Sequence, residues 1–182
     1  QGDFETDLRC PEGYLVSTME VTSERYLFVP QIYGITLHCA RAGGEHLLNL
    51  ADTTTRSWQF VSNNGGFTAY RDSIITGLRG YYRQTGLNFI KIIDAKQTQY
   101  LYNDEVGYTV GGTETWQDVP PSFAITSTGN VVAYCGSSDA TSQRTSVSGL
   151  SGIRIYSTER GSKEIVSALQ PRCSTLQRVA AN

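Results

Sequence analysis

Apolar and polar side chains alternate along two runs near the start of the chain, and this alternation predicts a pair of β-strands. In the first run, Tyr14 to Val21, apolar positions such as Leu15 and Val21 are interleaved with polar ones. The second run, Ile32 to Leu37, continues the pattern. A period of two is typical of a half-buried strand. We therefore expect an antiparallel pair joined as one β-hairpin with a long tip.

A glycine followed by alternating apolar residues occurs three times, at Gly34, Gly86 and Gly152, with spacings of 52 and 66 residues. Two Trp-Gln pairs stand 58 residues apart. Such recurrence favours three repeat units within one domain over residues 1–182. This short motif also arises easily in any β-rich chain, so a β-sandwich is the alternative. The expected units are 9–50, 56–102 and 114–173.

Segments between and after these strands are predicted from turn and breaker residues. A short strand at Leu47 to Leu50 is expected to end in a turn at Asp52 to Thr55. Lys163 to Leu169, before Pro171, fits either a strand or a short helical turn, and the repeat pattern favours a closing strand. We expect Thr175 to Asn182 to be a frayed or externally docked tail.

Composition supports an all-β fold. The 182 residues include 18 Gly and 11 Tyr but a single Met, and no long tract of helix-forming residues is present. A chain of this length can bury a core large enough to fold alone. Helix is therefore expected to be a minor component.

Charge and hydropathy exclude two classes of partner. The formal net charge of −2 gives no basic surface for nucleic acid. No stretch approaches the roughly 20 apolar residues of a membrane-spanning helix, so we expect no membrane insertion. Arg outnumbers Lys by 12 to 3, and Arg with Tyr is common at contact surfaces. This composition fits a binding or assembling protein, and equally well ordinary solvated side chains.

Four cysteines without a C-x-x-C pair fit two disulfides better than a zinc site. Disulfides imply an oxidising compartment, and the start at Gln1 is interpreted as a mature end after signal-peptide removal, so we expect secretion. Of the three possible pairings we predict Cys10–Cys39, which flanks the hairpin, and Cys135–Cys173, which ties the C-terminal segment to the third unit. Each would contribute roughly 3–4 kcal/mol.

The segment Cys10-Pro11-x-Gly13-Tyr14-Leu15-Val16-Ser17, followed by Gly34-Ile35-x-Leu37-x-Cys39, resembles one repeat of the vitelline membrane outer layer protein I family. The resemblance covers residues 9–40. Where the family usually has Asp-Asp-Thr-Ala, this chain has Phe28-Val29-Pro30-Gln31. The resemblance implies an all-β, disulfide-stapled β-prism of three antiparallel sheets with pseudo-threefold repeats, one sheet per repeat.

Sequence motifs for catalysis are not found, and we expect no catalytic residues, metal or cofactor. The chain has two histidines, His38 and His46, and no nucleophile elbow, zinc-protease helix, P-loop or dinucleotide fingerprint. On a strand, His38 takes the face opposite the sulfur of Cys39. Glu20 and Glu24 share a strand face, which suits a carboxylate pair for glycoside hydrolysis or, more simply, a solvated surface.

Carbohydrate binding is the sharper hypothesis. The chain is similar to β-prism lectins of the jacalin type in carrying glycine-rich turns with nearby aspartates and aromatic rings, and this resemblance implies sugar contacts at the loops. Structural turns are the alternative explanation for each Gly-Gly pair. The candidate ligand-binding residues are Gly43, Gly44, Gly65, Gly66, Gly111, Gly112, Tyr100, Tyr102, Asp104 and Asp139.

Together these features predict a secreted, non-enzymatic structural or binding component of an extracellular coat or matrix, of the egg-envelope or mucus type. The alternative is a secreted carbohydrate-binding lectin. A glycan-processing enzyme is a third class, suggested by the family alone. The expected partners are glycans, other extracellular coat proteins, or a second copy of the chain.

Overall fold

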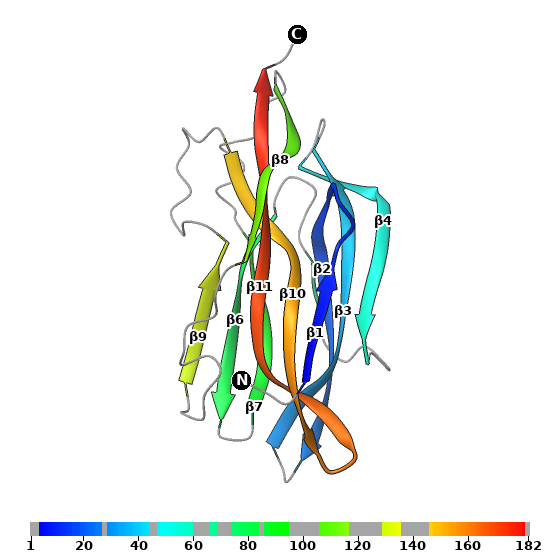
Figure 1. The fold of residues 1–182 in the computed structure, drawn as a ribbon, viewed down its shortest axis with the longest axis vertical. Helices are drawn as coiled ribbons and strands as arrows, with labels where there is room; N and C mark the ends of the chain where they lie inside the picture. Colours follow the sequence, from blue (N-terminus) through cyan, green and yellow to red (C-terminus); the bar gives the residue numbers. More distant parts are fainter. Residues whose placement is uncertain are drawn as a thin grey trace.

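A computed structural model describes residues 4–26, 29–43, 47–59, 66–68, 74–83, 86–94, 106–116, 129–135 and 146–180. Every regular element in these ranges is a β-strand, so the predicted all-β class is confirmed. The strands run mainly along the long axis of the molecule (Figure 1). They are β1 (Phe4–Arg9), β2 (Tyr14–Tyr26), β3 (Val29–Ala42), β4 (Leu48–Trp58), β5 (Gly66–Thr68), β6 (Ile75–Arg83), β7 (Gly86–Asp94), β8 (Val106–Trp116), β9 (Gly129–Tyr134), β10 (Ser146–Arg160) and β11 (Lys163–Ala180).

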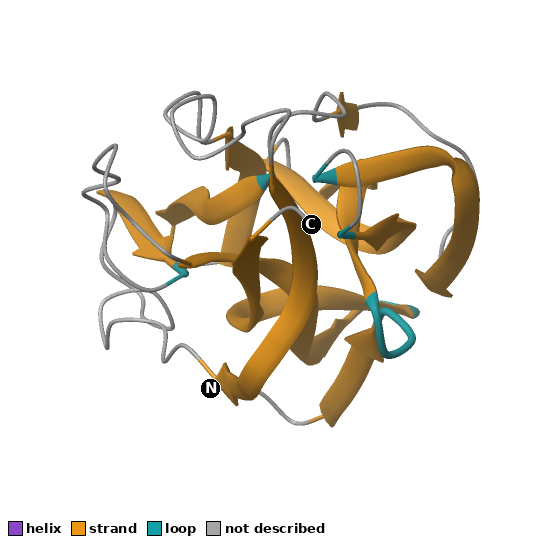
Figure 2. Ribbon diagram, turned by 90° about the horizontal axis from the view of Figure 1, so that it is seen from above, coloured by secondary structure: helices purple, strands orange, loops and turns teal. Residues whose placement is uncertain are grey.

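The described strands form two four-stranded sheets and one three-stranded sheet, all with antiparallel pairing. Sheet A has the order β1-β10-β11-β8, sheet B the order β4-β3-β2-β5, and sheet C the order β7-β6-β9. Strands of each sheet approach strands of the other two: β10 approaches β2, β3 approaches β7, and β10 approaches β6. Seen down the long axis, the strands lie around a common interior (Figure 2).

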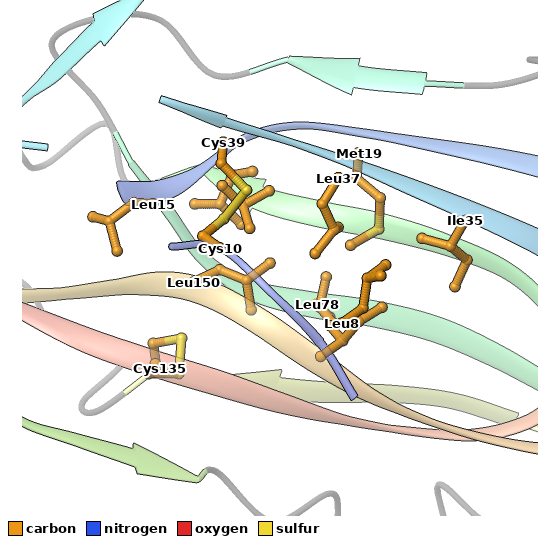
Figure 3. Packing of buried hydrophobic residues seen from close by; sticks show 14 of the residues in the cluster. Leu8, Cys10, Leu15, Met19, Ile35, Leu37, Cys39, Leu78, Cys135 and Leu150 are labelled. Carbon is orange, nitrogen blue, oxygen red and sulfur yellow. A yellow bond between two sulfur atoms is a disulfide. The ribbon is translucent and has the colours of Figure 1, made fainter. Parts of the chain in front are cut away.

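One hydrophobic cluster fills this interior. It receives side chains from all three sheets, including Met19 and Leu37 of sheet B, Leu78 of sheet C and Leu150 of sheet A (Figure 3). Each of these four side chains is almost completely buried. Because the three sheets share one core, burial of their apolar faces stabilises them as a unit.

The predicted β2–β3 hairpin is confirmed, but its expected long tip is wrong, because the two strands pair as far as Tyr26 and Val29. The register of the hairpin explains the loose alternation in the sequence. Val16 pairs with Cys39 and Thr18 with His38, so Ser17 is an extra residue at a β-bulge. The buried Ser17 hydroxyl donates to the carbonyl oxygen of His38, at 3.1 Å. A polar residue is therefore tolerated in a strand that is otherwise apolar on its inner side.

Two expectations about individual segments are wrong, and one is confirmed. The expected turn at Asp52 to Thr55 lies inside β4, which pairs with β3 from Leu48 to Trp58. Lys163 to Leu169 forms the favoured closing strand, as the start of β11, which continues through Pro171. Residues up to Ala180 pair with β8, so the described part of the expected tail is an integral strand. Long-range pairing overrides these local signals.

Sheet membership also departs from the expected one sheet per repeat unit. β1 precedes most of the first unit, yet it pairs with β10 in sheet A. β5 falls in the second unit but pairs with β2, and β8 joins sheet A although it lies largely before the third unit. The strands are thus shared between neighbouring units. The β-prism with threefold repeats stays a prediction.

Both predicted disulfides are present, Cys10–Cys39 and Cys135–Cys173. All four cysteines are buried. Cys10 follows β1 and its N–H donates to the carbonyl oxygen of Ser151 in β10, so the first disulfide joins sheet A to sheet B. Cys135 follows β9, so the second joins sheet C to sheet A. Each disulfide therefore links two sheets.

Candidate functional site

Three polar side chains meet at one end of sheet B, and we call them the Tyr14–Arg41–Asp52 cluster. Tyr14 opens β2 and pairs directly with Arg41 near the end of β3. Asp52 lies in β4 at an irregularity, since Ala40 pairs with Thr53 while Arg41 pairs with Asn49. The extra residues of β4 at this bulge bring the carboxylate of Asp52 beside Arg41 and Tyr14.

Every pair within the cluster is in direct contact. The Tyr14 hydroxyl donates to Asp52 Oδ1 at 2.9 Å and accepts from Arg41 Nη2 at 3.0 Å. Arg41 Nε donates to Asp52 Oδ2 at 2.7 Å. The guanidinium carbon also lies 4.8 Å from the centre of the Tyr14 ring, within cation–π range. The three groups therefore hold one another in a fixed arrangement.

The cluster combines an anchored side with an accessible side. The ring of Tyr14 packs against the hydrophobic core. The side chains of Arg41 and Asp52 remain 54% and 40% exposed. A rigid base with solvent-facing polar atoms is the arrangement expected of a binding site, because little side-chain freedom is lost when a ligand arrives.

Hydrogen bonding favours the ionised forms of Arg41 and Asp52. The hydrogen bond from Arg41, and then that from Tyr14, lowers the pKa of Asp52 below its ordinary value. The same contact with Asp52 raises the pKa of Arg41. At neutral pH the pair is therefore one cation beside one anion, with no net charge.

Two glycines shape the backbone beneath the cluster. Gly13 and Gly43 have φ angles of 88° and 96°, in the left-handed region that favours glycine. The Ala42 N–H donates to the carbonyl oxygen of Gly13 at 2.8 Å, and the Gly43 N–H donates to that of Leu47 at 3.1 Å. These turns fix the start of β2 and the end of β3, which carry Tyr14 and Arg41.

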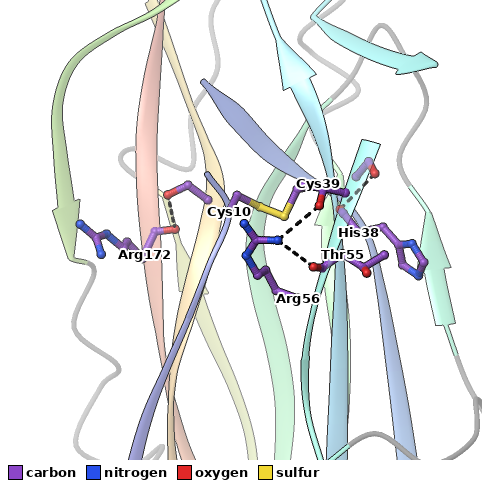
Figure 4. The surroundings of a disulfide bond; sticks show 9 residues. Cys10, His38, Cys39, Thr55, Arg56 and Arg172 are labelled. Atoms are coloured by element: carbon purple, nitrogen blue, oxygen red, sulfur yellow. Dashed lines mark hydrogen bonds between the residues drawn. A yellow bond between two sulfur atoms is a disulfide. The ribbon is translucent and has the colours of Figure 1, made fainter. Parts of the chain in front are cut away.

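A second polar arrangement lies on the outer face of sheet B. His38 Nε2 and Glu20 Oε1 are 2.7 Å apart, and Thr36 and Ser57 share a hydroxyl hydrogen bond of 2.7 Å on the same face. In Figure 4 the ring of His38 points away from the Cys10–Cys39 disulfide. The expectation that His38 and the sulfur of Cys39 take opposite faces is confirmed. The side chain of Glu24 lies outside the described ones.

On the inner side of the edge strand β4, Arg56 lies near the same disulfide (Figure 4). Its Nη1 donates to the carbonyl oxygen of Thr55 and to the hydroxyl of Thr54, at 2.9 and 3.3 Å. An inward-pointing charge on an edge strand discourages pairing with another chain. We therefore assign Arg56 to protection of the edge and not to ligand binding.

The sequence-predicted ligand residues are only partly described. Gly43 lies at the turn below the Tyr14–Arg41–Asp52 cluster. Gly66 is not in a loop but begins β5, opposite Glu20. Gly111 and Gly112 lie inside β8 of sheet A and not in a loop, beside an irregularity in its pairing with β11. Gly44, Gly65, Tyr100, Tyr102, Asp104 and Asp139 lie outside the described residues.

The described glycines do not form one site. Gly43 follows the end of β3 next to Tyr14, whereas Gly66 is level with Glu20, six residues further along β2. At about 3.3 Å per residue this is a separation on the order of 20 Å. Gly111 belongs to a different sheet. Of the predicted set, Gly43 is the described residue beside the cluster.

Sequence reasoning missed the cluster itself. The pairing of Tyr14 with Arg41 follows from a simple hairpin in which Val16 stands opposite Cys39, so these two residues could have been found from the predicted hairpin and its disulfide. Asp52 could not, because its position depends on a bulge that carries no local sequence signal.

In comparisons with known proteins, no family model, curated protein or solved structure matches the chain. Within the described ranges, no three or more His, Cys, Asp or Glu side chains gather as metal ligands. No helix among the described residues is long and apolar enough to cross a membrane. The two disulfides are compatible with an extracellular protein.

Proposed function

We propose that the protein is a secreted, non-enzymatic structural or binding component of an extracellular coat or matrix. The observation that carries this proposal is the pair of buried disulfides, each of which joins two sheets. Such disulfides persist in oxidising surroundings and restrict the unfolded chain, which suits a protein that must last outside the cell.

We propose further that the fold is a β-prism of the vitelline membrane outer layer type. The resemblance of residues 9–40 to one repeat of that family supports this, as do three sheets that contribute to one core. In this proposal the outer faces of the sheets are contact surfaces. The polar side chains that reach solvent on the outer face of sheet B, such as Ser57, His38 and Glu20, are suited to hydrogen bonding with a neighbouring coat component.

Light scattering coupled to size-exclusion chromatography tests the coat proposal. The disulfide-intact protein is applied over a wide concentration range, alone and with a soluble fraction of secreted matrix. Concentration-dependent assembly, alone or with a matrix protein, is the expected result. A strictly monomeric protein that binds no matrix component would contradict the coat proposal.

Carbohydrate binding is the second candidate function, and the Tyr14–Arg41–Asp52 cluster favours it. The cluster places a carboxylate acceptor and a guanidinium donor together beside a glycine turn. Sugars are recognised by such planar polar groups, because each sugar hydroxyl can both donate and accept a hydrogen bond. A glycan array on the native protein tests this function directly.

A further inference from the structure

We infer that the Tyr14–Arg41–Asp52 cluster is a binding site for neutral saccharides, in which Asp52 and Arg41 together engage two adjacent hydroxyl groups of one sugar ring. This inference rests on the carbohydrate-binding function proposed above and names its site and ligand class. It concerns residues that the glycine-loop hypothesis did not include.

The cluster retains hydrogen-bonding capacity that its own contacts do not use. A carboxylate offers about four acceptor positions and a guanidinium five N–H donors. Within the cluster, Asp52 accepts one bond at each oxygen, from Tyr14 and from Arg41. Among the described residues, Arg41 Nη1 makes no hydrogen bond. An acceptor position on Asp52 and a donor on Arg41 therefore remain for a ligand that reaches both residues, and the hydroxyls of a sugar ring present the complementary groups.

The absence of net charge on the cluster favours a neutral ligand. The Arg41 cation and the Asp52 anion are only 2.7 Å apart, so their fields largely cancel for a ligand that contacts both. A sulfated or sialylated glycan would bring an anion next to Asp52 and gain nothing net from Arg41. A neutral sugar meets no such repulsion, and its hydroxyls can both donate to the carboxylate and accept from the guanidinium.

The side chains of the cluster are preorganised for binding. Tyr14 is held by the core on one side and by Arg41 and Asp52 on the other. Gly13, whose φ of 88° shapes the turn before Tyr14, lies next to Arg41, since a Cβ added there would be at an ordinary contact distance of 3.8 Å from Arg41 Nη1. A ligand therefore meets polar groups that are already positioned, which limits the entropy lost on binding.

A matched control exists on sheet A. Arg154 Nε donates to Asp7 Oδ1 at 2.9 Å, and both side chains are partly exposed, at 27% and 41%. This pair also ties an edge strand, β1, to its neighbour. Its arginine is shared with a second carboxylate, Glu5, at 3.2 Å, so the local charge is negative. The inference predicts no neutral sugar site there.

The experiment uses the full disulfide-intact chain. A glycan array identifies the neutral oligosaccharide that binds best, and this oligosaccharide is titrated by calorimetry into wild type, Asp52→Asn, Tyr14→Phe and the control Asp7→Asn. We expect Asp52→Asn to weaken binding about tenfold or more, because charge-assisted hydrogen bonds are lost. Tyr14→Phe should weaken it several-fold, and Asp7→Asn should bind as wild type does. Circular dichroism confirms that each variant is folded.

Different results would contradict the carbohydrate-binding function and the assignment of its site to the cluster. If the array shows a neutral glycan but Asp52→Asn and Tyr14→Phe bind it as wild type does, carbohydrate binding stands and the site is elsewhere. If wild type binds no glycan, the carbohydrate-binding function fails and the site with it. Binding of acidic glycans alone, or equal losses in Asp52→Asn and Asp7→Asn, would also overturn the site. If Asp52→Asn does not fold, the affinities of Tyr14→Phe and Arg41→Lys for the same oligosaccharide decide whether the cluster is the site.

Discussion

Gly152 lies so close to Leu8 that no side chain fits between their strands. A Cβ at position 152 would stand 2.6 Å from the carbonyl oxygen of Leu8 and 3.1 Å from the Cα of Arg9. The approach occurs where β1 pairs with β10, next to the bulge that holds Ser151. The glycine at this position is therefore required by packing of backbone against backbone.

We predict that Gly152→Ala destabilises the protein by about 1–2 kcal/mol. Displacing backbone costs about 1–3 kcal/mol, and the loss of chain entropy in the unfolded state offsets less than 1 kcal/mol of it. Urea unfolding followed by tryptophan fluorescence measures the change. Gly149→Ala is the control, since its Cβ would meet the terminal methyl groups of Ile74 and Leu15, at 2.9 and 3.0 Å, and the ends of side chains shift at a lower cost than backbone. An equal or larger loss in the control would contradict the argument.

The same glycine shows what the sequence could predict. The sequence places Gly152 at the start of a strand motif, but the reason for a glycine there, contact with β1, depends on pairing between strands that are far apart in the sequence. Local alternation predicts strands well because it reflects one buried face. It does not predict which distant strand lies alongside, and for that reason the sheet positions of β1, β5 and β8 were missed.

Removal of either disulfide should cost about 3–4 kcal/mol. The bonded cysteines are 29 and 38 residues apart, and closing loops of this length restricts the unfolded chain by similar amounts. Paired alanine variants, Cys10→Ala with Cys39→Ala and Cys135→Ala with Cys173→Ala, avoid leaving a buried thiol. Their unfolding free energies in urea are compared with that of wild type.

Reduction of the wild-type protein provides the control for the disulfide variants. A thiol reductant in the unfolding buffer should lower the stability of wild type by the contribution of both disulfides. It should lower the stability of each paired variant only by the contribution of its one remaining disulfide. A paired variant with the same unfolding midpoint as wild type would show that its disulfide does not stabilise the fold.

We predict that the Asp52 carboxylate makes the stability of the protein depend on pH. Its pKa is lowered in the folded protein by hydrogen bonds from Arg41 and Tyr14. Its contribution to stability is therefore fully present above the ordinary aspartate pKa of about 3.9 and is lost as pH falls through the lowered value. The difference in stability between wild type and Asp52→Asn should shrink over this acidic range. Carboxyl-carbon NMR titration should place the pKa of Asp52 higher in Tyr14→Phe than in wild type, and an unchanged pKa would contradict the role of Tyr14.

The candidate site was harder to predict than the fold for a physical reason. The sequence predicts a loop at Gly111 and Gly112 because glycine is frequent in turns, yet both lie within β8 where its pairing with β11 is irregular. Gly66 likewise begins a strand. Glycine meets two different requirements, positive φ in turns and missing side chains in irregular strands, and sequence alone does not distinguish them. Among the described glycines of the predicted ligand set, Gly43, with φ of 96°, is the one that fits a turn.

Gln59 combines a strained backbone with a bridging side chain. Its φ of 50° lies in the left-handed region, and its Nε2 donates to the carbonyl oxygens of Tyr33 at 3.1 Å and of Glu164 at 3.2 Å. These bonds join sheet B to the β10–β11 hairpin of sheet A. Beside them, Lys163 Nζ lies 4.4 Å from the centre of the Tyr33 ring.

Substitution at position 59 separates these two effects. Gln59→Ala and Gln59→Gly lose the same side-chain hydrogen bonds, but only glycine adopts a positive φ without steric cost. We therefore expect Gln59→Gly to be more stable than Gln59→Ala by about 1 kcal/mol. Both should be less stable than a Glu159→Ala control, which alters an exposed position of β10. Urea unfolding of the three variants provides the comparison. Equal stability of the alanine and glycine variants would mean that the left-handed backbone at Gln59 carries no strain in solution.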